Sequence, residues 1–378
     1  MSPVSPRSVY VLAAGGTGGH LFPAEAVARL LVASGGAVHL LTDRRADAFA
    51  AAVPGVTIDL VRAGRFGGGP LHAAYGLAEL AVGVVQARRL LRRLTPAAVV
   101  GFGGYPSVPT MLAAAQLGLP TLIHEQNVVL GRANRLLAPR ARRIATSFAA
   151  TQGLRGADRG RAIHTGNPVR PAIHAAGALP YAAPEPGGPI ELLVVGGSQG
   201  ARIFGEIVPP ALACLPVELR ARLHVAQQAR PDDKDAVVAQ YVALGVAAEV
   251  QTFFDDMPAR LQRAHLVICR AGASTIAELA VAGRPAILVP YPHAMDDHQT
   301  ANAGAFAASG GGWVIAQPAF APETLAARLA GLIADPAALG GAAEAARRFA
   351  RDDAAEHLAA LVRELAPDRN GHPLERAA

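Results

Sequence analysis

Cysteine and lysine are nearly absent from this chain of 378 residues, which has two cysteines and one lysine, Lys234. Cys214 and Cys269 form no CxxC motif and are too few for a disulfide framework, a usage typical of a reducing compartment. No G-x-x-x-x-G-K-[ST] sequence occurs, so the sequence excludes a lysine-based phosphate loop. Phosphate, if it binds, must be held by backbone amides, hydroxyls or arginine.

Long apolar runs and aromatic residues are also scarce. No run reaches membrane-spanning length, and residues 9–14 are too short for a signal-peptide core and lead straight into a glycine loop, so we expect a cytoplasmic protein. The net charge of +6 would suit nucleic acid, but the arginines are scattered and aromatic residues make up only 5%. We therefore expect no nucleic acid partner, and assign the charge to a phosphate-bearing ligand, to an anionic membrane surface, or to arginine-biased composition alone.

Strand and helix patterns alternate along the chain, which indicates α/β architecture with parallel, doubly wound sheets. After an Ala-, Pro- and Gly-rich segment the opening pattern recurs, because a strand at residues 190–195 leads into a second glycine loop at 196–200. The sequence thus predicts two Rossmann-like domains facing one another across a cleft. Their expected bounds are 1–170 for the first domain, 171–189 for a linker, 190–345 for the second domain, 346–366 for a C-terminal helix packing back on the first domain, and 367–378 for a tail.

The stretch from Val267 to Asn302 carries the strongest site signal. A strand ends at Cys269, a small-residue turn follows, and a helical pattern resumes at Ser274 with Glu278 one turn in. A fresh helix N-terminus after a strand binds anions, because its first amides lack internal partners and the dipole is positive there. We expect a phosphate at this turn and a diol such as ribose on Glu278; the alternative is an ordinary N-cap at Ser274.

Three further loops follow strands and are expected to line one wall of a ligand crevice: residues 15–20, 101–107 and 124–127. The first is not the dinucleotide fingerprint, since Leu21 stands where its last glycine belongs. His20, at the end of this loop, is a candidate proton acceptor near neutral pH. Glu125 is its rival, and either residue can instead be a supporting hydrogen-bonding group.

Two other segments have competing interpretations. The helix expected at residues 71–94 carries apolar residues and ends in Arg88, Arg89, Arg92 and Arg93, which predicts either contact with anionic lipid or a core-facing helix with a basic C-terminus. Asp233-Lys234-Asp235 spells the D-x-D of metal-dependent glycosyltransferases, but its place after Pro231 favours a helix start.

These motifs together resemble the MurG family of glycosyltransferases. The resemblance spans residues 9 to about 360 and rests, in order, on GGTGGHLFPAEAVA, GFGGYPS, HEQNVVLGRANRLLA, TGNPVR, VVGGSQGAR, FFDDMP and CRAGASTIAELAVAGRPAILVPYPHAMDDHQTANA. It implies a GT-B fold and transfer, with inversion, of N-acetylglucosamine from UDP-N-acetylglucosamine to the muramoyl 4-hydroxyl of lipid I, giving lipid II for peptidoglycan. It also implies peripheral attachment to the cytoplasmic face of the plasma membrane. A UDP-N-acetylglucosamine 2-epimerase, or another GT-B UDP-sugar transferase, is the alternative.

The resemblance also implies the residues of the donor site. Expected contacts with UDP-N-acetylglucosamine are Thr17, Gly18, Gly19, Asn127, Arg170, Ser198, Phe254 through its backbone, Ala273, Ser274, Thr275, Ile276, Ala277, Glu278, Gln299 and Asn302. Glu278 is expected on the ribose, and Gln299 and Asn302 on the sugar. Ala271 and Ala277 stand where relatives often have serine, which leaves the phosphate more dependent on amides.

The expected mechanism is a single inversion. His20 is the first choice for the base that takes the acceptor proton, and Glu125 the second; such a base contributes roughly 100- to 10,000-fold. The turn and helix start at 273–278, with Ser198, are expected to stabilise the departing UDP. This scheme requires no metal and no cofactor.

Overall fold

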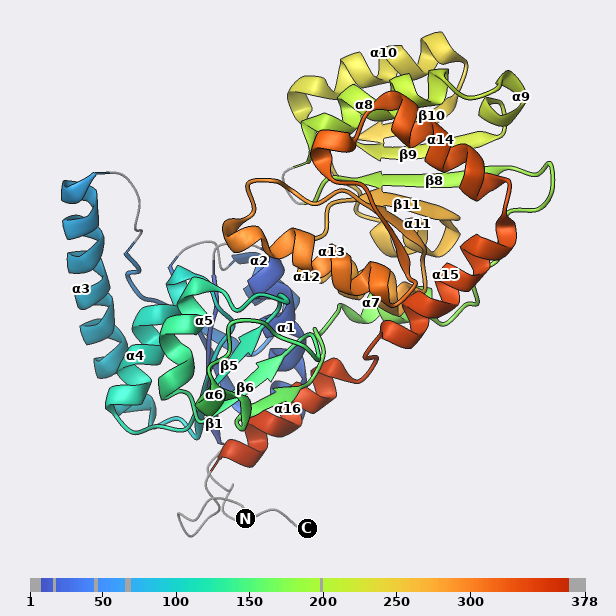
Figure 1. Cartoon of the computed structure of the whole chain (residues 1–378). Coiled ribbons are helices and arrows are strands. Elements are labelled where there is room, and N and C mark those ends of the chain that lie inside the picture. Colours follow the sequence, from blue (N-terminus) through green and yellow to red (C-terminus); the bar gives the residue numbers. More distant parts are fainter. Residues whose placement is uncertain (1–7, 16–17, 44–46, 65–68, 198–199, 367–378) are drawn as a thin grey trace. The chain divides into compact units, whose positions relative to one another are not determined.

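The computed structural model describes residues 8–15, 18–43, 47–64, 69–197 and 200–366 (Figure 1). The chain divides into two compact units. Unit 1 consists of residues 1–169 and 352–378, and unit 2 consists of residues 170–351.

Unit 1 is built on a seven-stranded sheet in which every neighbouring pair is parallel. Its strands are β1 (Val9–Ala13), β2 (Ala37–Thr42), β3 (Val56–Leu60), β4 (Ala98–Gly101), β5 (Thr121–Glu125), β6 (Arg143–Thr146) and β7 (Ala162–His164). They lie in the order β3-β2-β1-β4-β5-β6-β7. The order reverses between β1 and β4, and ligands of open α/β sheets bind beyond the strand carboxyl ends at such a switch point.

Helices cover both faces of this sheet (Figure 1). They are α1 (Gly18–Ala33), α2 (Asp47–Ala52), α3 (Pro70–Leu94), α4 (Val108–Gln116), α5 (Arg132–Leu137), α6 (Gly156–Arg159) and α16 (Ala354–Leu365), with short 3-10 turns at Tyr105–Ser107 and Ala138–Arg140. Side chains of β1 alternate between the faces, because successive strand residues point to opposite sides. Leu12 packs in the cluster that holds α1 and α16, and Val11 packs in the cluster that holds α3 and α4.

Unit 2 repeats the plan with a six-stranded parallel sheet. Its strands are β8 (Ile190–Val195), β9 (Leu223–Gln228), β10 (Ala247–Gln251), β11 (Leu266–Cys269), β12 (Ala286–Leu288) and β13 (Gly312–Val314). The order β10-β9-β8-β11-β12-β13 reverses between β8 and β11. The predicted α/β class with two Rossmann-like sheets is confirmed, and the turn after β11 lies at the switch point of unit 2.

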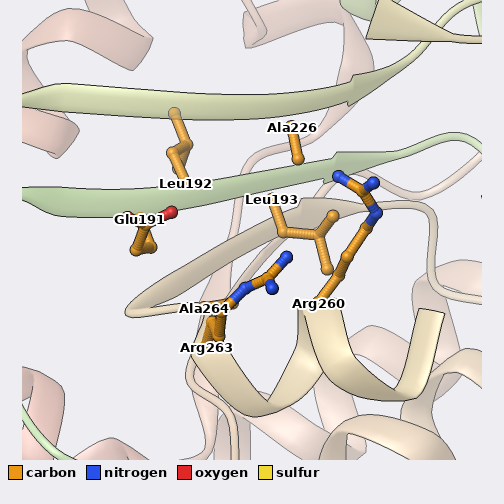
Figure 2. A pocket seen from close by; sticks show the side chains of 7 residues that line it. All are labelled: Glu191, Leu192, Leu193, Ala226, Arg260, Arg263 and Ala264. Carbon is orange, nitrogen blue, oxygen red and sulfur yellow. The ribbon is translucent and has the colours of Figure 1, made fainter. Parts of the chain in front are cut away.

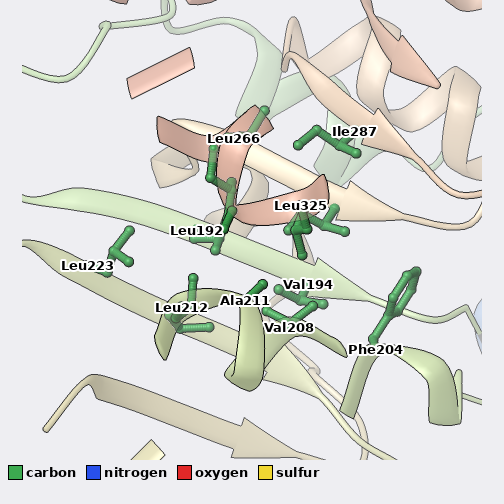
Figure 3. Close-up of a cluster of buried hydrophobic side chains, with 14 of the residues drawn as sticks. Leu192, Val194, Phe204, Val208, Ala211, Leu212, Leu223, Leu266, Ile287 and Leu325 are labelled. Atoms are coloured by element: carbon green, nitrogen blue, oxygen red, sulfur yellow. The ribbon is translucent and has the colours of Figure 1, made fainter. Parts of the chain in front are cut away.

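The helices of unit 2 pack with its sheet, which shares one large apolar cluster with some of them (Figure 3). They are α7 (Pro171–Gly177), α8 (Arg202–Ala213), α9 (Val217–Arg220), α10 (Lys234–Leu244), α11 (Met257–Arg263), α12 (Ala273–Ala282), α13 (His298–Ala308), α14 (Pro322–Ile333) and α15 (Pro336–Phe349), with 3-10 turns at Pro231–Asp233, Met295–Asp297 and Gln317–Ala319. Val194 of β8 and Phe204 of α8 are fully buried with Leu325 of α14. Each such side chain contributes about 1.5–3 kcal/mol by leaving water, which holds the β8 and β11 ends in place.

Two expected boundaries differ from the structure. Residues 171–189 were expected as a linker, but Pro171–Gly177 forms helix α7, which packs against α11 and α12 inside unit 2. The expected single helix over 346–366 is two helices, because the backbone is extended at Ala350 and α16 begins only at Ala354. Asp352 and Asp353 disfavour a helix interior, since their short side chains compete for backbone hydrogen bonds.

Within the described residues, no helix has the length and apolar character needed to cross a membrane. Asp233-Lys234-Asp235 forms the start of α10, with Lys234 as its first residue, so the predicted helix start is confirmed.

Candidate active site

The turn between β11 and α12 has the features of an anion site. Gly272 is the residue before the helix, with an extended backbone, and no side chain caps the helix there. The alternative of Ser274 as an ordinary N-cap is therefore wrong. Among the described residues, none forms a hydrogen bond with the buried Ser274 Oγ. A buried hydroxyl and the orphan amides of Ala273, Ser274 and Thr275 together form a set of donors for a phosphate.

Arg170 and Glu278 form an ion pair beside this helix start. Arg170 Nη2 donates to Glu278 Oε1 at 3.2 Å, although 107 residues separate them along the chain. Burial raises the pKa of Glu278 above its ordinary value, and the charge of Arg170 opposes this rise. The structure thus joins two predicted donor residues in unit 2 and places a carboxylate where it can accept hydroxyl hydrogens.

Gln299 and Asn302 join the start of α13 to the same turn. Gln299 Oε1 accepts from the amides of Ala271 at 3.2 Å and Tyr291 at 2.9 Å, so the side-chain NH₂ points away from both amides. Asn302 is fully buried, and its Nδ2 donates to the carbonyl of Ala271 at 3.1 Å. Gln299 can offer donors to a sugar, whereas Asn302 holds the turn that forms the anion site.

Phe254 follows β10 and lies 4% exposed. The guanidinium of Arg260 lies 3.9 Å from the centre of its ring. Because its ring is enclosed, Phe254 can offer only its backbone to a nucleobase, and the expected contact with uracil stays a prediction. Arg260 also lines the pocket of Figure 2, where it extends from α11; that pocket contains none of the predicted site residues.

His20 lies in the first turn of α1, at the switch point of unit 1. Its ring is packed against the loop after β4: a Cβ on Gly104 would lie 3.2 Å from its Cδ2, and one on Gly103 would lie 3.4 Å from its Cε1. Nδ1 of His20 is 3.1 Å from Gln126 Oε1. Since an amide oxygen only accepts, Nδ1 carries a hydrogen and the lone pair of the neutral ring is on Nε2.

Glu125 has a different environment, because it is 2% exposed and accepts four hydrogen bonds. Oε1 accepts from the backbone and side-chain nitrogens of Asn127 at 3.0 and 3.3 Å. Oε2 accepts from the Gly131 amide at 2.9 Å and from Asn134 Nδ2 at 2.8 Å. A carboxylate with its lone pairs so occupied organises the loop from 125 to 134, and it has little capacity left to take a proton from a substrate.

The remaining predicted residues divide into two groups. Gly18 and Gly19 begin α1 immediately before His20, and Asn127 is bound to Glu125; all three belong to unit 1. Thr17 and Ser198 lie outside the described residues. Sequence reasoning missed Gln126, which contacts His20, and Asp43, whose Oδ2 accepts from the Tyr105 hydroxyl at 2.8 Å beside the loop after β4. The polar end of strand β5 was the available signal for Gln126.

Comparison with known proteins gives consistent matches over both units. Models of the glycosyltransferase family 28 N-terminal and C-terminal domains match residues 10–146 and 191–358. The UDP-N-acetylglucosamine–N-acetylmuramyl-(pentapeptide) pyrophosphoryl-undecaprenol N-acetylglucosamine transferase of Rhodospirillum centenum is 58% identical over 96% of this chain and 95% of its own length.

Two solved structures show the same fold. The crystal structure of Acinetobacter baumannii MurG has a TM-score of 0.76 and 32% identity, covering 95% of this chain and 99% of its own. A Listeria monocytogenes protein described as a UDP-N-acetylglucosamine 2-epimerase has a TM-score of 0.67 over 95% of this chain and 96% of its own, but its 15% identity shows the fold alone.

The two parallel-sheet units and the glycosyltransferase domains define this chain as a glycosyltransferase of the GT-B class. Within that class, the family follows from the sequence identity of this chain to curated relatives and to a solved MurG structure over nearly its whole length. The chain belongs to the MurG family.

Proposed function

We propose that this enzyme transfers N-acetylglucosamine from UDP-N-acetylglucosamine to the 4-hydroxyl of the muramoyl residue of lipid I, undecaprenyl-pyrophosphoryl-MurNAc-pentapeptide. The product is lipid II, a precursor of peptidoglycan and hence of the growing and dividing cell wall. The observation that carries the proposal is the α12 start, where orphan amides and a buried hydroxyl, which has no hydrogen-bond partner among the described residues, lie beside the Arg170–Glu278 pair. A diphosphate is bound by hydrogen-bond donors, and the hydroxyls of a ribose are bound by an acceptor such as a carboxylate.

In the proposed reaction, Nε2 of His20 takes the proton of the acceptor hydroxyl. That oxygen attacks the anomeric carbon from the face opposite the UDP, the bond from carbon to UDP oxygen breaks, and the configuration inverts. The negative charge on the departing diphosphate is stabilised by the amides and hydroxyl of Ala273 to Thr275, which are already oriented before the reaction. The saturated hydrogen bonding of Glu125 favours His20 over Glu125 as the base.

The test is product formation from labelled UDP-N-acetylglucosamine and a lipid I analogue by wild type and His20→Ala, with donor affinity measured on both. We expect the disaccharide lipid with wild type, and loss of turnover by roughly 100-fold or more in the variant, with unchanged donor affinity. His357→Ala, at an exposed site on α16, is the matched control. Isomerised UDP-sugar without any disaccharide would instead establish the epimerase alternative.

We also propose that the enzyme attaches peripherally to the cytoplasmic face of the plasma membrane and has no nucleic acid partner. Helix α3 supports this proposal, because Tyr75 and Leu77 are 69% and 61% exposed, and Val82 and Val85 are exposed with them. Four exposed arginines, Arg88, Arg89, Arg92 and Arg93, end the same helix. An apolar surface beside basic residues fits an anionic lipid surface. Binding to vesicles with and without anionic lipid tests this part of the proposal.

A further inference from the structure

A row of hydrogen bonds leads from His20 into the interior of unit 1. It passes through Gln126, which is 2% exposed, to His124, which is fully buried on β5. Neither Gln126 nor His124 has a role in the reaction proposed above. Their arrangement nevertheless bears on which nitrogen of His20 carries a hydrogen.

The orientation of the Gln126 amide follows from its neighbours. Its Nε2 lies 2.9 Å from the carbonyl of Phe102 and 3.2 Å from the carbonyl of His124. Carbonyl oxygens only accept, so the NH₂ group must face them and Oε1 must face His20. A flipped amide would leave two carbonyls and the amide oxygen opposing one another in a buried site, at a cost of several lost hydrogen bonds.

The tautomer of His124 is consistent with this orientation. Its Nε2 lies 3.2 Å from the Gly166 carbonyl, which requires a hydrogen on Nε2, with Ser147 Oγ also at 3.2 Å. The lone pair is then on Nδ1, which lies 3.0 Å from the donating Gln126 Nε2. Burial lowers the pKa of His124 to about 4, so the ring stays neutral at physiological pH and keeps this acceptor.

We propose that Gln126 is a positioning residue, held in orientation by His124 and the Phe102 carbonyl, which fixes His20 as the tautomer with hydrogen on Nδ1 and the lone pair on Nε2. Gln126 touches no substrate and acts only through His20. The inference rests on the proposed function, because it matters for catalysis only if His20 is the base. A base with its lone pair on the wrong nitrogen cannot take the acceptor proton, however well it is placed.

The test combines Gln126→Met, which keeps the length of the side chain but cannot accept from His20 Nδ1–H as the amide does, with ¹⁵N NMR of the histidine rings. The chain has 12 histidines, and His20→Ala identifies the His20 signals. In wild type we expect protonated Nδ1 and unprotonated Nε2. In Gln126→Met we expect a mixture of tautomers, kcat lower by about 100-fold, and donor affinity within twofold of wild type. Gln116→Met, at the exposed end of α4, should leave the tautomer and kcat unchanged.

Wild-type His20 with its hydrogen on Nε2 would overturn the inference without any variant, so the test does not depend on the folding of Gln126→Met. An unchanged tautomer and kcat in Gln126→Met would overturn it as well. Failure of the proposed function would look different: wild type would form no disaccharide lipid, whereas the ring signals would still report the tautomer.

Discussion

Glycine at position 104 sets the space that the His20 ring occupies. Its φ is +70°, and a Cβ there would lie 3.2 Å from His20 Cδ2. Gly104→Ala should therefore cost about 1–3 kcal/mol of unfolding free energy, because its φ of 70° and ψ of 159° lie in a backbone region essentially restricted to glycine, and should also displace the ring. Because catalysis is sensitive to misplacement on the ångström scale, we expect kcat to fall by about 100-fold. Denaturant unfolding and steady-state kinetics measure the two effects.

Gly118 provides the matched control for this variant. It has nearly the same φ, +67°, but no heavy atom lies within 4 Å of its ideal Cβ. Gly118→Ala should also lose unfolding free energy, because its φ is positive, but with kcat intact. Equal kcat values in the two variants would refute the role given to the loop after β4.

His124 links the stability of unit 1 to pH. Its pKa is about 4 in the folded chain, below the ordinary 6.5, because burial disfavours the charged ring. Above pH 6.5 its neutral form is present in both states. As pH falls from 6.5 toward 4 only the unfolded chain gains the proton, so stability falls, by about 3 kcal/mol over this range. Hydrogen exchange of the β5 amides from pH 7 to 4.5, corrected for intrinsic rates, measures this loss in unit 1.

His124→Asn should have a lower stability at pH 7 but a smaller slope between pH 6.5 and 4.5. A slope equal to that of wild type would assign the acid sensitivity to other groups.

The sequence predicted His20 and Glu125 as rival bases, and it had no means of separating them. His20 follows β1 and Glu125 ends β5, so both lie toward the carboxyl edge of the sheet, which is all that spacing reveals. The distinction lies in hydrogen-bond geometry: Glu125 accepts from Asn127, Gly131 and Asn134, whereas Nδ1 of His20 lies against the amide oxygen of Gln126. Such partners come from loops of irregular backbone, whose course sequence patterns do not predict.

At the scale of the element, helix α3 presents two apolar surfaces. Ala87 and Leu91 pack into the core of unit 1, whereas Tyr75, Leu77 and Val85 are exposed. In Figure 1 the C-terminal half of α3 runs beside α4, and its N-terminal half extends beyond it. The core-facing interpretation is therefore confirmed for one side of the helix, whereas contact of the exposed side with anionic lipid stays a prediction.

Replacing Arg88 and Arg92 with glutamine should weaken binding to anionic vesicles. Each basic residue near such a surface contributes roughly 1 kcal/mol, so the double variant should bind about 30-fold more weakly, with a reduced dependence on salt. Vesicle sedimentation at two salt concentrations measures this. Arg155→Gln with Arg159→Gln, exposed on and before α6, is the control with equal charge. Equal weakening in both double variants would point to net charge rather than to α3.

Helix α16 belongs to the core of unit 1 although α15, directly before it, belongs to unit 2. Leu358 is fully buried with residues of α1. Leu358→Ala should cost about 3 kcal/mol, because it removes buried methyl groups and leaves a cavity. Leu77→Ala, on the exposed side of α3, should change stability by less than about 0.5 kcal/mol. Thermal unfolding of both variants tests this, and similar losses would contradict the assignment of α16 to the core.

At the scale of the whole molecule, the alternation of strands and helices was sufficient to predict the α/β class and the repeat of one plan. Regular elements follow hydrophobic periodicity, which is local information. The linker was predicted less well, because an Ala-, Pro- and Gly-rich composition indicated a linker, whereas Pro171 begins α7, a position that proline favours. The single terminal helix was also wrong, since the break at Ala350 comes where the chain passes from unit 2 to unit 1.

The division into units gives the last prediction, which concerns UDP without its sugar. The residues proposed to bind the diphosphate, the ribose and the uracil of UDP all lie in unit 2. We therefore expect UDP to stabilise unit 2 against unfolding more than it stabilises unit 1. At a concentration 100 times the dissociation constant, the gain is about 2.7 kcal/mol for a ligand that binds only the folded state. Hydrogen exchange should therefore slow in α12 and in the loop that contains Phe254, with little change in β1 and β5. In Ser274→Ala the protection of α12 should weaken, because the phosphate loses one donor. Protection confined to unit 1 would place the nucleotide elsewhere and would remove the basis for the donor site proposed at α12.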